Sequence, residues 1–416
     1  MNESTTQPRD QPVQIHYCHQ VDDPYSQLML QILPALTAFE AIDLTLHIVP
    51  PPSDAAAPDR ARLQAWSRRD AAALADALGL AFVARSHEPD PGHVALAQRA
   101  AVAACARNVT TMAVLRELDA IGQALWRGDS TALSNLPLAT VAEADASLTA
   151  NAAWRQQNGH YLGATLFFNG EWFWGVDRFN HLEQRLRSLD LVPTDAGLSA
   201  AHLPQLALER LPAPGKRPTL QFFCSARSPY TYLSIPRVVQ LVKHYGAKLE
   251  MRFVLPMIMR GLPVPTEKVT YILRDAKRLA DSLGMPFGKV SDPVGKPTER
   301  CLAVLHHAIH MGTGREMDFF SSFMRGVWSE GIDAGSDAGL EQIAERAGID
   351  AAFVVAALAD ESWRAVAEAN RDEMLACGLW GVPTFRVDGG TARWGQDRLW
   401  QVERDLIAAT QATPQL

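Results

Sequence analysis

Cysteine is scarce in this chain and lacks the spacing of redox or zinc motifs. Five cysteines are spread over 416 residues, and no two are separated by only two residues. They are Cys18, Cys105, Cys224, Cys301 and Cys377. This spacing argues against a paired-cysteine oxidoreductase and against the common structural zinc motifs. An odd number of isolated cysteines is typical of a reduced protein without structural disulfides, and we therefore expect a cytoplasmic location.

Long apolar segments and an excess of positive charge are absent as well. The opening residues MNESTTQPRDQPVQ are polar and lack the apolar run of a secretory signal. No apolar stretch reaches the length of a membrane-spanning helix. The formal net charge of −7 offers no electrostatic reason to expect nucleic acid or an anionic membrane as a partner. Apolar residues make up 47% of the chain, which is enough for ordinary domain cores.

What the sequence does contain is an internal repeat. The first half ends YLGATLFFNGEWFWGVDRFNHLEQRLRSL and the second ends LWGVPTFRVDGGTARWGQDRLWQVERDLI. Both show a Thr-led apolar run, a turn, an aromatic strand, Trp-Gly-x-Asp-Arg and an amphipathic helix. The starts, VQIHYCHQVDDPYSQLM and TLQFFCSARSPYTYLSI, align with one extra residue in the first, which pairs Cys18 with Cys224 and Tyr25 with Tyr230. We interpret the chain as a tandem duplication.

The repeat predicts the domain organisation. Residues 1–12 form a disordered tail, 13–190 a first domain and 218–410 a second domain. The segment 191–217 between them is rich in proline and glycine and is predicted to be a linker.

Each half shows the same order of predicted elements. A short strand (Val13–Cys18; Thr219–Cys224) precedes a helix (Pro24–Phe39; Pro229–Tyr245). A second strand, a long helical segment, two short strands and a final helix follow. The opening implies a parallel strand pair with a right-handed crossover. The predicted fold class is α/β, with two tandem thioredoxin-like domains that each carry a helical insertion.

Four motifs of the second half resemble one family. SPYTYL, KVTYILRDAKRLADSLGMPF, GVPTFRVDG and WGQDRL are similar to the 2-hydroxychromene-2-carboxylate isomerase and kappa-class glutathione transferase branch of the DsbA-like superfamily. The resemblance extends from Thr219 to Leu406. The first half shares only DDPYSQL and FFNGEWFWGVDR with it. The family implies glutathione as the cofactor.

Ser228 is the candidate catalytic residue. A serine directly before a proline-started helix is a good N-cap, which requires no further function. A helix N-terminus also stabilises an anion and lowers the pKa of a thiol. By the resemblance, the Ser228 hydroxyl binds the glutathione sulfur, with Pro229 and Tyr230 beside it. A serine can activate this borrowed thiol, whereas a cysteine would form a mixed disulfide with it.

The remaining motifs add candidate glutathione-binding residues. The resemblance makes Pro383 a cis-proline and frees the backbone of Val382 to pair with glutathione, although an ordinary strand-entry proline is the alternative. It assigns Asp397 to the γ-glutamyl amino group, with Gln396 and Arg398 as neighbours. Asp397 as a simple helix cap and Arg398 as a solvated residue remain open.

The helical insertion supplies one further candidate and one departure from the family. Lys268 is a candidate partner for a glutathione or substrate carboxylate, although a lysine is usually a solvated surface charge. Gly295 and Lys296 stand where the family often has an asparagine, which puts the substrate and the catalysis in question. His306 and His310 share a helix face without a zincin motif, so no metal site is expected.

The first half is predicted to be catalytically silent. Asp23 takes the Ser228 position, where a carboxylate would repel a thiolate, and Ala164 replaces Pro383. We expect a domain that supports the second one, in a monomer with an internal pseudo-dimer or in a homodimer.

The function implied by the resemblance is a glutathione-dependent isomerase. Thiolate addition, bond rotation and elimination would act on a conjugated aromatic acid. The alternatives are kappa-like conjugation of glutathione to a small-molecule electrophile, and a thioredoxin-like binding module without catalysis. A dithiol oxidoreductase is disfavoured because the paired cysteines are missing.

Overall fold

The computed structural model describes residues 11–83, 85–193, 202–210 and 217–411. Most of the predicted tail and much of the predicted linker lie outside the described residues. The chain divides between Pro204 and Gln205 into two compact units, called here the first and second unit. No helix of the described residues is long and apolar enough to cross a membrane.

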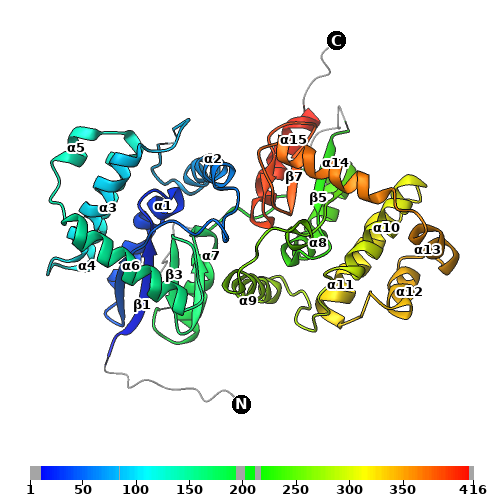
Figure 1. Cartoon of the computed structure of the whole chain (residues 1–416), viewed down its shortest axis with the longest axis horizontal. Helices are drawn as coiled ribbons and strands as arrows, with labels where there is room; N and C mark the ends of the chain where they lie inside the picture. The colour runs from blue at the N-terminus through cyan, green and yellow to red at the C-terminus, as the bar shows by residue number, and fades with distance from the viewer. Residues whose placement is uncertain (1–10, 84, 194–201, 211–216, 412–416) are drawn as a thin grey trace, which may run out of the picture. The chain divides into compact units, whose positions relative to one another are not determined.

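The first unit contains one four-stranded sheet and seven α-helices within its described residues (Figure 1). In chain order the elements are β1 (Val13–His19), α1 (Pro24–Ile32), β2 (Ile42–Ile48), α2 (Arg60–Leu78), α3 (Pro91–Cys105), α4 (Thr111–Arg127), α5 (Ser130–Ser134), α6 (Val141–Gln157), β3 (Thr165–Phe168), β4 (Glu171–Trp174) and α7 (Val176–Ser188). The strand order is β2-β1-β3-β4, with β1 parallel to β2 and the other pairs antiparallel.

The second unit repeats this plan. Its elements are β5 (Thr219–Cys224), α8 (Pro229–His244), β6 (Lys248–Phe253), α9 (Thr266–Ser282), α10 (Lys296–His310), α11 (Glu316–Arg325), α12 (Asp337–Arg346), α13 (Ala351–Leu358), α14 (Trp363–Ala376), β7 (Thr384–Val387), β8 (Arg393–Trp394) and α15 (Leu399–Gln411). The order β6-β5-β7-β8 again combines one parallel pair with antiparallel pairs. The predicted fold class is confirmed.

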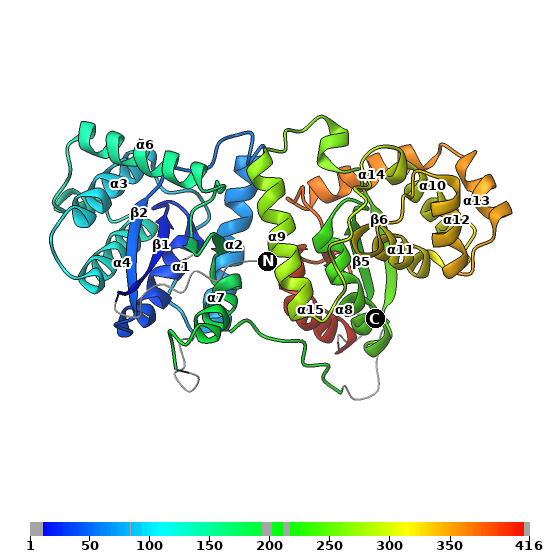
Figure 2. The same cartoon turned by 90° about the horizontal axis from the view of Figure 1, so that it is seen from below.

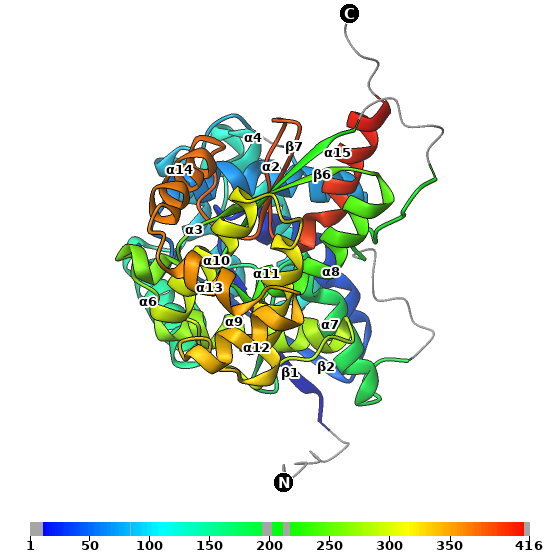
Figure 3. The same cartoon turned by 90° about the vertical axis from the view of Figure 1, so that its right-hand side faces the viewer.

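The helical insertion of the second unit forms a separate layer. Helices α10 to α13 gather beside β5 and β6 in Figure 2 and face the viewer in Figure 3. Their apolar side chains join those of the sheet and of α8 in one buried core. Burial of this apolar surface is the main stabilising contribution to the unit.

The register of β1 corrects the predicted alignment of the two halves. Cys18 lies opposite Thr165 in the first sheet, and Phe223 lies opposite Thr384 in the second. Cys18 therefore corresponds to Phe223, and its predicted pairing with Cys224 is wrong by one residue. The alignment matched two cysteines by identity, whereas the hydrogen-bonded ladder sets the register and requires no extra residue.

The first predicted helix is also shorter than expected. Helix α1 ends at Ile32, and the chain continues as a 3₁₀ turn over Leu33–Ala38. Pro34 stands in this turn and has no backbone N–H to donate, which favours an end of the α-helix before it. In the second unit, α8 closely matches its predicted span.

The sheet places the start of one helix at a defined point in each unit. A short loop connects β1 to α1 and β5 to α8, and the parallel strand follows beyond the helix. The helix N-terminus therefore faces outward at the carboxyl end of the first strand, where ligands bind in α/β sheets of this type.

Candidate functional site

Ser228 is the N-cap residue of α8. Its Oγ accepts a hydrogen bond from the Thr231 backbone N–H at 3.1 Å, so the predicted capping role is present. The hydroxyl lies 3.4 Å from the Val382 carbonyl oxygen, and the side chain is 9% exposed. A contact of that length is weak, so the hydroxyl proton remains available to a stronger acceptor.

The GVPT segment lies directly beside this hydroxyl. The Val382–Pro383 peptide bond is cis, as predicted. Among the described residues, the backbone N–H of Val382 has no hydrogen-bond partner. The Gly395 backbone N–H donates to the Pro383 carbonyl at 2.9 Å, which brings the WGQDRL motif to the same place. Three motifs that are far apart in the sequence therefore meet around Ser228.

The WGQDRL residues form a 3₁₀ turn before the last helix. Gln396–Arg398 make this turn, and α15 begins directly after it at Leu399. Gln396 is buried, accepts from Arg237 and donates to Asp397.

The other two residues of the turn differ in exposure. Arg398 is only 4% exposed, which rules out its reading as a solvated helix residue. Asp397 is partly exposed, and its carboxylate accepts from the Gln396 side chain. Asp397 is therefore the acidic group of this turn that a ligand can still reach.

Lys268 lies in the first turn of α9 and is partly buried. Burial lowers the pKa of its ammonium group. Further along the same helix, the buried Asp275 carboxylate accepts from the Tyr230 hydroxyl at 2.8 Å and from Arg278 at 3.2 Å. The bond from Tyr230 holds α9 against α8, whereas the bond from Arg278 lies within α9.

The sequence comparison missed this Tyr–Asp contact, although both halves contain it. Tyr25 donates to Asp70 at 2.8 Å in the first unit, and the two residues are 45 positions apart, as are Tyr230 and Asp275. The signal was visible in RRDAAALADALGLAF and LRDAKRLADSLGMPF, which align without a gap.

A second pair next to the site was also missed. Arg227 binds Asp292 through two hydrogen bonds of 2.7 Å. Asp292 lies three residues before Gly295, which has a left-handed φ of 74° and precedes Lys296 at the start of α10. The segment that departs from the family is thus joined to the Ser228 loop by an ion pair. No local pattern could have assigned Arg227 its partner, because 65 residues separate the two.

The corresponding position of the first unit carries Asp23, as predicted. Asp23 caps α1 by accepting from the backbone N–H groups of Tyr25 and Ser26, and it also accepts from the Ser26 hydroxyl at 2.9 Å. Burial, together with the neighbouring charge of Asp22, raises its pKa to about 7. Ala164 replaces the cis-proline and has a left-handed φ of 54°.

Comparison with known protein families finds a match within the second unit. Residues 219–406 match the family described as DSBA-like thioredoxin domain. The match covers the sheet of the second unit and the helical segment between β6 and β7. No curated protein matches the chain.

Solved structures similar to the chain cover about half of it. A putative protein disulfide isomerase from Nitrosomonas europaea is 17% identical over 45% of this chain and 97% of its own, with a TM-score of 0.36. A 2-hydroxychromene-2-carboxylate isomerase is 21% identical over 45% and 93%, with a TM-score of 0.37. The cytosolic disulfide reductase DsbM from Pseudomonas aeruginosa is 21% identical over 46% and 96%, with a TM-score of 0.37.

Proposed function

We propose that the second unit binds glutathione at the N-terminus of α8 and uses its thiolate to isomerise a conjugated aromatic acid. The activity would be of the 2-hydroxychromene-2-carboxylate isomerase type. The observation that carries this proposal is that the Ser228 hydroxyl lies beside Val382, whose backbone N–H has no hydrogen-bond partner within the described part of the chain. The Ser228 hydroxyl is the donor that a thiolate site requires, and the backbone N–H of Val382 is the donor that an extended peptide requires.

The residues of the site fit glutathione. The N–H of Val382 can pair with the backbone of an extended peptide, as an unpaired strand edge does. Asp397 offers a reachable carboxylate to the γ-glutamyl ammonium group. Lys268 offers a cation to a carboxylate of glutathione or of the substrate, and burial lowers the pKa of its ammonium group.

The protein's part in the reaction is to hold a thiolate. The first backbone N–H groups of α8 and its dipole favour an anion, and the Ser228 hydroxyl adds a donor. Bound glutathione would supply a sulfur that adds to the conjugated system and leaves after rotation, so no oxidant is consumed. A serine suits this role because it cannot form a mixed disulfide with the sulfur.

Calorimetric titration of glutathione tests the proposal, with the pKa of the bound thiol followed by thiolate absorbance. A hydrogen bond to a charged group contributes about 1.5–3 kcal/mol. At 1.36 kcal/mol per pKa unit, Ser228→Ala should therefore raise the pKa of the bound thiol by about one to two units. Ser336→Ala is the matched control, because Ser336 caps α12 through an equivalent bond to the Gly339 N–H at 3.1 Å.

The outcomes separate the candidate functions. Binding with a depressed thiol pKa that is lost only in Ser228→Ala supports the thiolate site, and turnover of a hydroxychromene carboxylate then supports the isomerase. Formation of a glutathione conjugate instead would identify a transferase. Binding without turnover of either substrate class would identify a binding module. If glutathione does not bind the wild-type protein, the proposal is wrong.

A further inference from the structure

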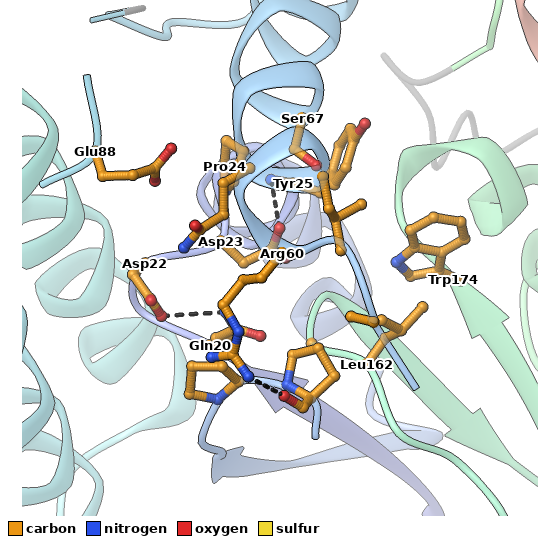
Figure 4. A pocket seen from close by; sticks show the side chains of 16 residues that line it. Gln20, Asp22, Asp23, Pro24, Tyr25, Arg60, Ser67, Glu88, Leu162 and Trp174 are labelled. Atoms are coloured by element: carbon orange, nitrogen blue, oxygen red, sulfur yellow. Dashed lines mark hydrogen bonds between the residues drawn. The ribbon is translucent and has the colours of Figure 1, made fainter. Parts of the chain in front are cut away.

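A shallow recess opens at the N-terminus of α1 in the first unit (Figure 4). It lies where the second unit has Ser228, in the half of the chain that the sequence predicts to be silent. Residues Arg60, Leu63, Gln64 and Ser67 of α2 line one wall. Their spacing of three and four residues places them on one helix face, so α2 presents a continuous surface to the recess.

The recess combines an apolar wall with an acidic floor. Tyr25 and Trp174 are two of its lining residues, and their rings pack edge to face with 5.9 Å between the ring centroids. Asp22 and Asp23 follow each other directly and line the recess beside them. The lining is thus shaped for a molecule with an apolar body and one polar end.

The other charged groups of the recess are already paired. Arg60 forms an ion pair with Asp54 at 2.8 Å and donates to the Pro52 carbonyl at 2.8 Å. Glu88 is paired with Arg68. Arg60 nevertheless acts on Asp22 through its charge, which lowers the pKa of that carboxyl.

The two aspartates, in contrast, lack a cation at contact distance. Asp22 accepts one hydrogen bond, from the Gln20 side chain at 3.1 Å, and the bonds of Asp23 all come from its own helix start. Within the described residues neither carboxylate takes part in an ion pair. Burial raises the pKa of both carboxyl groups, although the charge of Arg60 partly offsets this effect for Asp22.

Ser67 provides an independent sign of a ligand. Its side chain lines the recess and is only 5% exposed, yet it makes no hydrogen bond to any described residue. The Ser67 Oγ is not fully enclosed, so a polar group that enters the recess can reach it. A polar group of a bound molecule would satisfy it.

We propose that this recess is a binding site for a small organic amine with an apolar body. An ammonium group would compensate the charge of Asp22 and Asp23. It would also gain from the faces of Tyr25 and Trp174, since cations are attracted to aromatic rings. An anion would be repelled by the same carboxylates, so the site is not a second copy of the thiolate site of the second unit. The two units would then recognise ligands of opposite charge.

The test uses phenethylamine as the probe and 2-phenylethanol as its neutral counterpart, each titrated calorimetrically into the full chain. The two molecules share ring and chain length, so the difference in affinity reports the charge. Phenethylamine should bind at least about tenfold more tightly, which corresponds to about 1.4 kcal/mol. Asp22→Asn should remove most of that difference, while Asp145→Asn, an exposed acid on α6, should leave it unchanged.

A second variant separates loss of the site from loss of the fold. Leu63→Trp fills the recess without changing its charge, and it should abolish binding of both probes. A thermal unfolding transition like that of the wild type should show that the variant is still folded. Equal affinity for the amine and the alcohol would overturn the proposal, because the recess would then be a merely apolar cavity. Absence of phenethylamine binding to the wild-type protein would overturn it as well.

Discussion

The charge of Asp23 provides a sharp test of the structure, because its pKa links the stability of the first unit to pH. The carboxyl has a pKa of about 7 in the folded chain, against an ordinary value of 3.8. Between these values the folded state binds more protons than the unfolded state. The free energy of unfolding that this group contributes therefore falls as pH rises from about 4 to 7, and the contribution is lost above the folded pKa.

The magnitude follows from the size of the shift. A difference of about three pKa units corresponds to about 4 kcal/mol at 1.36 kcal/mol per unit. Solvent reaches the recess and Asp22 shares the effect, so we expect an observable change of about 1–2 kcal/mol. Asp23→Asn removes the titration and keeps an N-cap of similar quality, because the asparagine oxygen can still accept from the backbone N–H groups of α1.

The assay is urea unfolding of the wild type and Asp23→Asn at pH 5 and at pH 8. We expect the free energy of unfolding of the variant, measured relative to that of the wild type, to be lower at pH 5 than at pH 8. Asp90→Asn is the control, since Asp90 also caps a helix, α3, but is exposed. An identical pH dependence in wild type and Asp23→Asn would refute the assignment of a buried, poorly compensated carboxylate at this N-cap.

Two further predictions concern the second unit. Ser228→Cys should react with glutathione disulfide, because the new thiolate attacks one sulfur and releases one glutathione. Mass spectrometry should then detect one added glutathionyl group, which a reductant removes. An unmodified protein would count against an anion-stabilising helix start at this position. Tyr230→Phe should lower the free energy of unfolding by about 1–3 kcal/mol, since it removes a donor from the buried Asp275. Asp318→Asn on α11 is the control, because it breaks only the exposed ion pair with Arg315, and urea denaturation should show no comparable loss of stability for it.

Much of the candidate site of the second unit was predictable from local sequence. Ser228 before Pro229 indicates an N-cap, and the structure places it there. The cis bond before Pro383 was implied by the family resemblance, not by the local sequence, and it is present. The contacts that surround these residues were not predictable. Asp275 and Asp292 reach the site from 45 and 65 residues away along the chain, and no local pattern assigns such partners.

The first unit shows the opposite balance. The sequence correctly marked Asp23 and Ala164 as replacements for Ser228 and Pro383, and the expectation of a silent domain followed from those losses. The structure instead surrounds Asp23 with a recess whose acidic and aromatic lining has its own chemistry. The local sequence shows which residues of the second-unit site are missing from the first unit. It does not show which side chains line the recess, because some of them, such as Ser67, come from another helix, α2.

By itself the sequence determined the α/β class, the order of elements in both halves and the helix starts at Asp23 and Ser228. These features depend on hydrophobic periodicity and on residues close to one another in the chain, and such signals are local. Only the tertiary structure decided the register of β1, the partner of Arg227, the burial of Arg398 and the existence of the recess. Each of these depends on which distant segments pack together, because burial and charge compensation arise only when the core has formed.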